Sequence, residues 1–187
     1  MLVDNIEIED INPIPPIEDK DQKELFAFYG LASYTGQCLE KGMVNFAMAY
    51  RLLDESALTE QEWSDIYDHL NKQTFGRLLN QIKSKIEIPI KIEERLNLSL
   101  KKRNWLAHDF FYDYATHFYD PTSDGIVVML KELQDMIYLF QVTDRLIDTI
   151  YLKVWEKFGV TEEWIHKEME EQYQEYLSVK NEGYGEG

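Results

Sequence analysis

Three polar side chains with different chemistry lie close together in the segment KKRNWLAHDFF, residues 101–111. Arg103 supplies a guanidinium that stays charged at any ordinary pH, Asn104 an amide and His108 an imidazole. On a helical wheel, Arg103 falls in the centre of an apolar stripe formed by Leu96, Leu100, Ala107, Phe110, Tyr114 and Phe118. Burying an unpaired guanidinium is very costly. Arg103 is therefore expected to pair with an acid, to lie at a subunit interface, or to face a solvated cleft.

The spacing of the three residues leaves two ways for them to meet. Asn104 and His108 are one helical turn apart on the rim of the stripe. Arg103 and His108 are about 140° apart on an ideal helix, so one long arginine side chain could bend toward the other two. A second copy of the helix could instead bring all six side chains together across a twofold axis.

A purely structural explanation of the same residues stays open. Arg103 could form a buried ion pair with an acid such as Asp54 or Asp144, and the Asn104 amide could form a hydrogen bond with a backbone group. In that case the cluster would stabilise the fold and do no chemistry.

The pattern of apolar residues predicts helices and no convincing strand, so the fold class is all-α, a bundle with two or three long helices. The prolines and acids within residues 1–20 indicate an extended arm. Residues 21–180 are expected to form a single helical domain, and residues 181–187 a disordered tail. The expected helices span residues 21–53, 59–70, 74–86, 92–118, 126–158 and 161–179.

Local signals place several helix ends. TEQE at 59–62 is a capping box, in which Thr59 and Glu62 satisfy each other's backbone amides. DPTSDG at 120–125 is a turn, Gly159 is expected to stop a helix, and Thr161 is expected to cap the next one. The glycines of the first helix, Gly30, Gly36 and Gly42, are expected to permit close helix contact.

Composition narrows the class of protein. The net charge of −16 argues against a broad basic face for nucleic acid, although it leaves room for a small positive pocket. Nine of the 19 lysine and arginine residues lie in the central third of the chain. The single cysteine, Cys38, cannot form an internal disulfide and suits a reducing compartment. With no signal-peptide pattern and no apolar run of transmembrane length, the expected location is the cytoplasm.

The motif RNWLAH resembles the Arg-x4-6-His signature of HEPN domains, with Asn104 in the position of the polar residue that commonly follows the arginine. The wider pattern LxxRNxLAHxFF is similar to that of small bacterial HEPN-like proteins, and the helical layout agrees with that family. The resemblance implies an all-α bundle that acts as a homodimer through the helix at 92–118. Many HEPN domains are metal-independent endoribonucleases of the toxin or defence type.

The resemblance also implies roles for the three residues. Arg103 would stabilise negative charge developing on the scissile phosphate. His108 would act as general acid or base, or orient the attacking ribose 2′-hydroxyl, and Asn104 would position His108 or the phosphate. No cofactor and no metal are expected. RNA would bind in a small cleft, and an antitoxin or regulatory protein is a further expected partner.

A second function stays open beside this one. Other HEPN domains are non-catalytic interaction or dimerisation modules. The charge of −16 favours that alternative, because it weakens the attraction of phosphate. Asp109, directly after His108, would weaken this attraction further if it faced the cleft. The intact Arg103 and His108 favour the ribonuclease.

Overall fold

The computed structural model describes residues 11–53, 59–120, 122 and 124–183, and every regular element in these ranges is a helix. The all-α prediction is therefore confirmed. The elements are α1 Gln22–Leu53, α2 Glu60–Asn71, α3 Phe75–Lys85, α4 Ile90–His108, α5 Phe110–Asp113, α6 Ala115–Phe118, α7 Asp124–Trp155, the short 3-10 segment η2 Glu156–Phe158 and α8 Glu162–Gly183.

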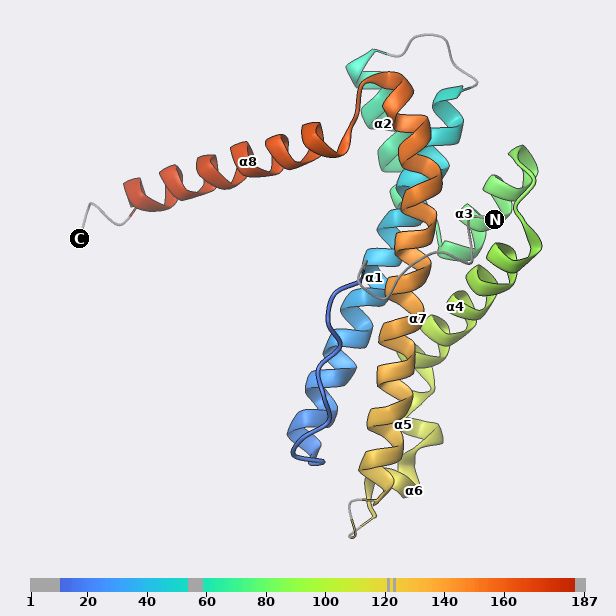
Figure 1. Ribbon diagram of the computed structural model, residues 1–187, viewed down its shortest axis with the longest axis vertical. Coiled ribbons are helices and arrows are strands. Elements are labelled where there is room, and N and C mark those ends of the chain that lie inside the picture. The colour runs from blue at the N-terminus through green and yellow to red at the C-terminus, as the bar shows by residue number, and fades with distance from the viewer. Residues whose placement is uncertain (1–10, 54–58, 121, 123, 184–187) are drawn as a thin grey trace.

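Two long helices, α1 and α7, form the axis of the bundle and run side by side in the same direction (Figure 1). Their facing sides supply most of the core, including Leu25, Phe28, Ala32, Leu39, Met43, Phe46, Met129, Leu133, Ile137 and Phe140. The close contact depends on Gly42, because a Cβ there would lie 2.4 Å from Oδ1 of Asp144. Gly30 has nothing within 4 Å of the same position, so the expectation of close contact does not hold there.

The helix ends follow the local signals in the sequence. Thr59 Oγ1 accepts a hydrogen bond from the Glu62 amide at 3.3 Å, and Glu62 Oε2 accepts one from the Thr59 amide at 2.9 Å. The capping box is therefore present. Gly159 adopts φ +82° after η2, and Thr161 Oγ1 caps α8 by accepting from the Trp164 amide at 3.2 Å.

The prediction of a single helix at 92–118 is wrong, because the chain bends twice in that range. Asp109 and Tyr114 leave helical geometry, with φ/ψ of −123°/−14° and −96°/15°, and they separate α4, α5 and α6. The bends allow the Phe110 side chain to be buried. They also bring the ring centroid of Phe111 to 5.0 Å from that of Tyr29 in α1. Aromatic packing against α1 thus outweighs the local preference for one straight helix.

The two ends of the described chain differ from each other. Residues 11–20 form no helix; Ile14 and Ile17 pack on the core, and Gln134 Nε2 donates to the Pro15 carbonyl at 2.9 Å. At the other end, α8 continues through residues 181–183, where the sequence predicted disorder. Residues 1–10 of the predicted arm and 184–187 of the predicted tail lie outside the described ranges.

Among the helices that the structure describes, none is long and apolar enough to cross a membrane.

Candidate functional site

Arg103, Asn104 and His108 line one open groove of about 860 Å³ between α1, α4 and the α2–α3 connection. We call this the motif groove. Its other walls are Gln37, Glu40, Lys41, Val44, Asn71, Gln73, Thr74, Phe75, Gly76, Leu78 and Leu100. The structure therefore brings all three residues of the sequence motif to one solvated space within a single chain.

Arg103 is held in the groove by an ion pair with Glu40 of α1. Its Nη2 atom lies 2.8 Å from Glu40 Oε1 and donates to Oε2 at 3.0 Å. Its Nη1 atom donates to Asn104 Oδ1 at 3.2 Å, so the side chain does bend toward Asn104. The Arg103 and Glu40 side chains remain 34% and 25% exposed. The pair is therefore partly solvated, and its electrostatic attraction is weakened by water.

The acid partner and the position of Arg103 both differ from expectation. Asp144 is not the partner of Arg103, because Glu40 fills that place, and Asp54 lies outside the described residues. The buried face of α4 passes through Ile92, Leu96, Ser99 and Leu106, whereas Ala107 is exposed. Arg103 thus lies at the edge of the apolar stripe instead of its centre. An acid partner and a solvated groove, offered above as alternatives, occur together.

His108 is the last residue of α4, and its side chain is exposed at the end of the motif groove. Asn104 lies one turn earlier and is also exposed. An exposed imidazole in a groove can reach a ligand and exchange a proton with it. A guanidinium in the same groove can bind an oxyanion with two parallel hydrogen bonds. Together these groups can bind an anionic ligand and move a proton.

Two further charged residues of the groove, Glu40 and Lys41, could not be predicted from the sequence. Both lie on α1, far from the motif in the chain, and only the packing of α1 against α4 brings them to it. Lys41 Nζ donates to Asn71 Oδ1 at the far wall of the groove. The groove therefore contains two cations, Arg103 and Lys41, and one carboxylate that neutralises the first.

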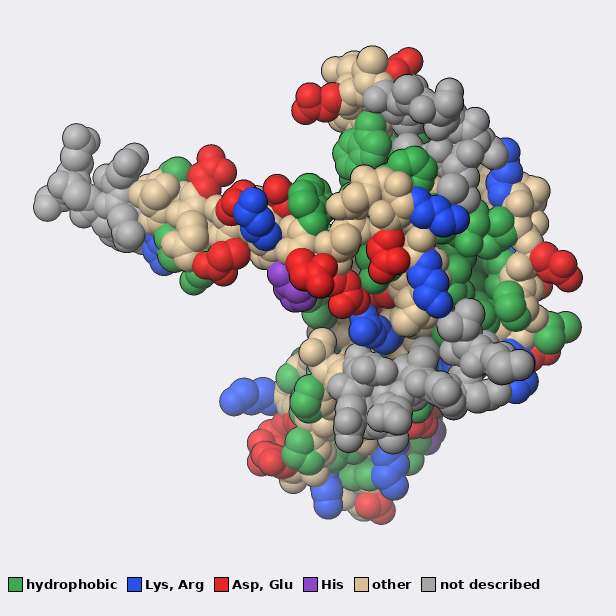
Figure 2. Space-filling view, turned by 45° about the horizontal axis from the view of Figure 1, so that its top comes forward, with side chains coloured by type: hydrophobic (Ala, Val, Ile, Leu, Met, Phe, Trp, Pro, Cys, Tyr) green, Lys and Arg blue, Asp and Glu red, His purple; other side chains and the backbone are tan. Residues whose placement is uncertain are grey.

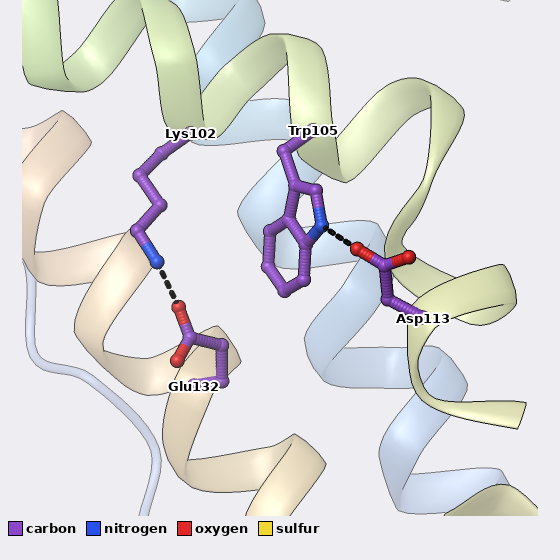
Figure 3. A network of polar contacts seen from close by, with 4 residues as sticks. All are labelled: Lys102, Trp105, Asp113 and Glu132. Atoms are coloured by element: carbon purple, nitrogen blue, oxygen red, sulfur yellow. Dashed lines mark hydrogen bonds and ion pairs between the residues drawn. The ribbon is translucent and has the colours of Figure 1, made fainter. Parts of the chain in front are cut away.

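The opposite side of α4 is fixed to the bundle by polar contacts (Figure 3). Lys102 forms an ion pair with Glu132 of α7, and Trp105 Nε1 donates to Asp113 Oδ2 of α5 at 2.7 Å. The buried hydroxyls of Ser99 and Thr143 lie 3.0 Å apart and join α4 to α7 a turn earlier. These contacts set the rotation of α4, and with it the direction in which Arg103 and His108 face.

In comparisons with protein-family models, with curated proteins and with solved structures, no match to this chain was found. Within the described ranges, no group of three or more His, Cys, Asp or Glu side chains could hold a metal ion.

A second polar cluster lies beside the α1–α7 contact and is centred on Asp144. Burial, and then the neighbouring Asp148 carboxylate, raise the pKa of Asp144 to about 7. Asp144 Oδ1 is buried without a hydrogen-bond partner. A buried acceptor of this kind costs stability when it carries a charge.

Asp144→Asn is expected to raise the free energy of unfolding by about 1–3 kcal/mol at pH 8 and by clearly less at pH 5. The folded chain keeps the Asp144 proton up to a pKa of about 7. The unfolded chain loses that proton near pH 4, so between these values the folded state binds more protons and stability falls as pH rises. Urea denaturation at both pH values measures the effect, with exposed Asp135→Asn as the matched control. An equal gain at both pH values would contradict it.

Proposed function

We propose that this protein is a HEPN-like, metal-independent endoribonuclease of the toxin or defence type that acts as a homodimer in the cytoplasm. The observation that carries the proposal is the motif groove, in which Arg103, Asn104 and His108 face one solvated space beside Lys41. Incubation of the purified protein with RNA in the presence of EDTA, with His108→Ala beside the wild type, tests it.

The proposed reaction is an in-line attack by a ribose 2′-hydroxyl on the neighbouring phosphorus. The 2′-oxygen forms a bond to phosphorus while the bond from phosphorus to the 5′-oxygen breaks. One proton leaves the 2′-hydroxyl and one is taken up by the departing 5′-oxygen. His108 carries out one of these transfers, and Arg103 stabilises the charge that builds up on the non-bridging phosphate oxygens.

A homodimer through the segment 92–118, now α4 to α6, would complete this site. Two copies of His108 near a twofold axis would supply both a base and an acid, and two copies of Arg103 would face the same phosphate. The position of His108 at the exposed end of α4 supports this arrangement. Light scattering at micromolar concentration is expected to give the mass of a dimer, and a monomer would remove the composite site.

Glu40→Gln is expected to strengthen RNA binding in the motif groove, by several-fold to about tenfold in Kd. In the free protein the Glu40 carboxylate forms an ion pair with the Arg103 guanidinium, and a phosphate would bind to the same guanidinium. The substitution removes this competitor and a negative charge. A 2′-O-methyl oligonucleotide, which cannot be cleaved by this route, is the ligand for the titration.

The matched control for this titration is Glu94→Gln, which makes the same charge change at an exposed position of α4 that does not line the groove. It is expected to leave Kd within about twofold, since exposed charges are screened by salt. Weaker binding by Glu40→Gln than by this control would show that Glu40 positions Arg103 for the ligand instead of competing with it.

The alternative function, a non-catalytic HEPN-like interaction module, is favoured by the same ion pair. Arg103 already has a carboxylate partner, and the net charge of −16 opposes RNA binding. In this alternative the groove or the dimer surface would receive a protein, such as an antitoxin or regulatory partner, and no variant would affect RNA.

A further inference from the structure

Lys41 is the residue that gives the motif groove an excess of positive charge. With His108 neutral, the lining contains two cations, Arg103 and Lys41, and one carboxylate, Glu40. Glu40 is paired with Arg103. The Nζ atom of Lys41 instead donates to Oδ1 of Asn71, a neutral amide, and none of the ion pairs within the described ranges includes Lys41.

The two cations of the groove are held by different helices. Glu40 and Lys41 are consecutive residues of α1, and Glu40 contacts Arg103 of α4. Lys41 contacts Asn71, the last residue of α2. The groove between these walls has a volume of about 860 Å³, which is enough for a small ligand. A ligand with one anionic group can bind at one of the two walls, and binding at both takes a second anionic group.

The contact with Asn71 prepares Lys41 for an anion. A lysine ammonium can only donate hydrogen bonds, so Asn71 presents its oxygen to Lys41 and keeps its NH₂ group for another acceptor. The hydrogen bond also holds the long, exposed lysine side chain at the groove, which lowers the conformational entropy that a ligand must remove. This wall therefore offers donors and positive charge, which are the groups that bind phosphate oxygens.

The net charge of −16 is not spread evenly over the chain. The helix α8 alone carries seven glutamates against two lysines, and it projects from the bundle on the side away from α4 (Figure 1). Acidic side chains are visible along this projecting helix (Figure 2). Salt screens exposed charges beyond about 8 Å at physiological ionic strength. The attraction of a phosphate to the motif groove therefore depends mainly on the charges that line it.

We propose that Lys41 binds the phosphate next to the scissile one, while Arg103 binds the scissile phosphate itself. The inference rests on the proposed function and extends it to the class of substrate, an RNA strand that places at least two consecutive phosphodiesters in the groove. Because Glu40 compensates the charge of Arg103 until a ligand displaces it, Lys41 provides the attraction for the incoming strand. A ligand with one phosphodiester gains one of the two contacts and binds more weakly.

A titration followed by NMR tests this role of Lys41. The ligand is a 2′-O-methyl trinucleotide without terminal phosphates, which carries two phosphodiesters and cannot be cleaved by attack of a 2′-hydroxyl. Lys41→Gln is expected to weaken its binding by about three- to tenfold in Kd. It is also expected to reduce the slope of log Kd against log salt by about 0.7, as for the loss of one phosphate contact to a single strand.

Two further trinucleotides, each with a neutral methylphosphonate in place of one phosphodiester, show whether Lys41 and a phosphate interact. At one of the two positions the neutral linkage is expected to weaken binding by the wild type about three- to tenfold and by Lys41→Gln less than about twofold, the non-additivity of groups in contact. Lys41→Arg keeps the charge and is expected to bind the unmodified trinucleotide within about threefold of the wild type.

The matched control is Lys101→Gln, which makes the same charge change at an exposed position of α4 that does not line the groove. It is expected to leave Kd within about twofold. Equal losses for Lys41→Gln and this control, or equal losses for the wild type and Lys41→Gln with both neutral linkages, would overturn the proposal.

Cleavage of RNA in EDTA is scored separately from binding. Cleavage by the wild type without non-additivity at Lys41 would retain the ribonuclease and overturn the role of Lys41. Non-additivity without cleavage would overturn the ribonuclease and retain Lys41 as a phosphate-binding residue. Absence of both binding and cleavage would overturn both.

Discussion

His108→Ala is expected to lower the rate of RNA cleavage by a factor of about 10² to 10⁴, which is the usual contribution of a general acid–base group. The imidazole lies at the exposed end of α4 and lines the motif groove. Its removal should therefore change proton transfer and leave the fold intact. Single-turnover kinetics on a labelled RNA measure the rate, and thermal denaturation checks the fold.

The matched control for this prediction is His69→Ala. His69 is an exposed histidine on α2 that does not line the motif groove. Its loss is expected to leave the cleavage rate within about twofold, as for a surface substitution away from a site. If both variants lowered the rate equally, His108 would have no specific part in the chemistry.

Arg103→Ala is expected to lower the cleavage rate by a factor of about 10² to 10³, because it removes the charge that stabilises the reacting phosphate. Its effect on stability should be only about 1 kcal/mol, because the pair with Glu40 is partly solvated. A fully buried ion pair would instead cost about 3–5 kcal/mol when one partner is removed. The ratio of the two effects therefore distinguishes a groove residue from a structural one.

Arg103→Lys separates charge from shape at the same position. Lysine keeps the positive charge but lacks the planar fork that binds two oxygens at once. The variant is expected to fold normally and to recover only part of the lost rate. A fall in melting temperature with Arg103→Ala that matches a loss of 3–5 kcal/mol, and full recovery of that stability with Arg103→Lys, would favour the structural explanation.

Local features of the sequence predicted most of the helical layout. The bounds of α1, α2 and α3 agree with the predicted ranges to within one or two residues, because apolar spacing and caps such as Thr59 are encoded locally. The bends at Asp109 and Tyr114 were not predictable in this way. They depend on ring contacts of Phe110 and Phe111 with Tyr29 of α1, and no short-range pattern specifies those contacts.

The same distinction between local sequence signals and three-dimensional packing applies to the candidate site. Arg103, Asn104 and His108 share one helix, so their spacing could be assessed from sequence. Glu40 belongs to a distant part of the chain, and its pairing with Arg103 follows from how α1 rotates against α4. Contacts at Ser99 and Lys102 set that rotation through α7, which only the three-dimensional packing reveals.

The ends of the cleavage products test the proposed function most directly. An RNA oligonucleotide is incubated with the protein in EDTA, and the fragments are weighed by mass spectrometry beside a matched 2′-O-methyl strand. Attack by the 2′-hydroxyl predicts fragments with a 2′,3′-cyclic phosphate and a 5′-hydroxyl, no cleavage of the 2′-O-methyl strand, and loss of the fragments with His108→Ala. An intact RNA across single-stranded and structured substrates, or EDTA-sensitive fragments with 5′-phosphates, would contradict the ribonuclease and favour the interaction module.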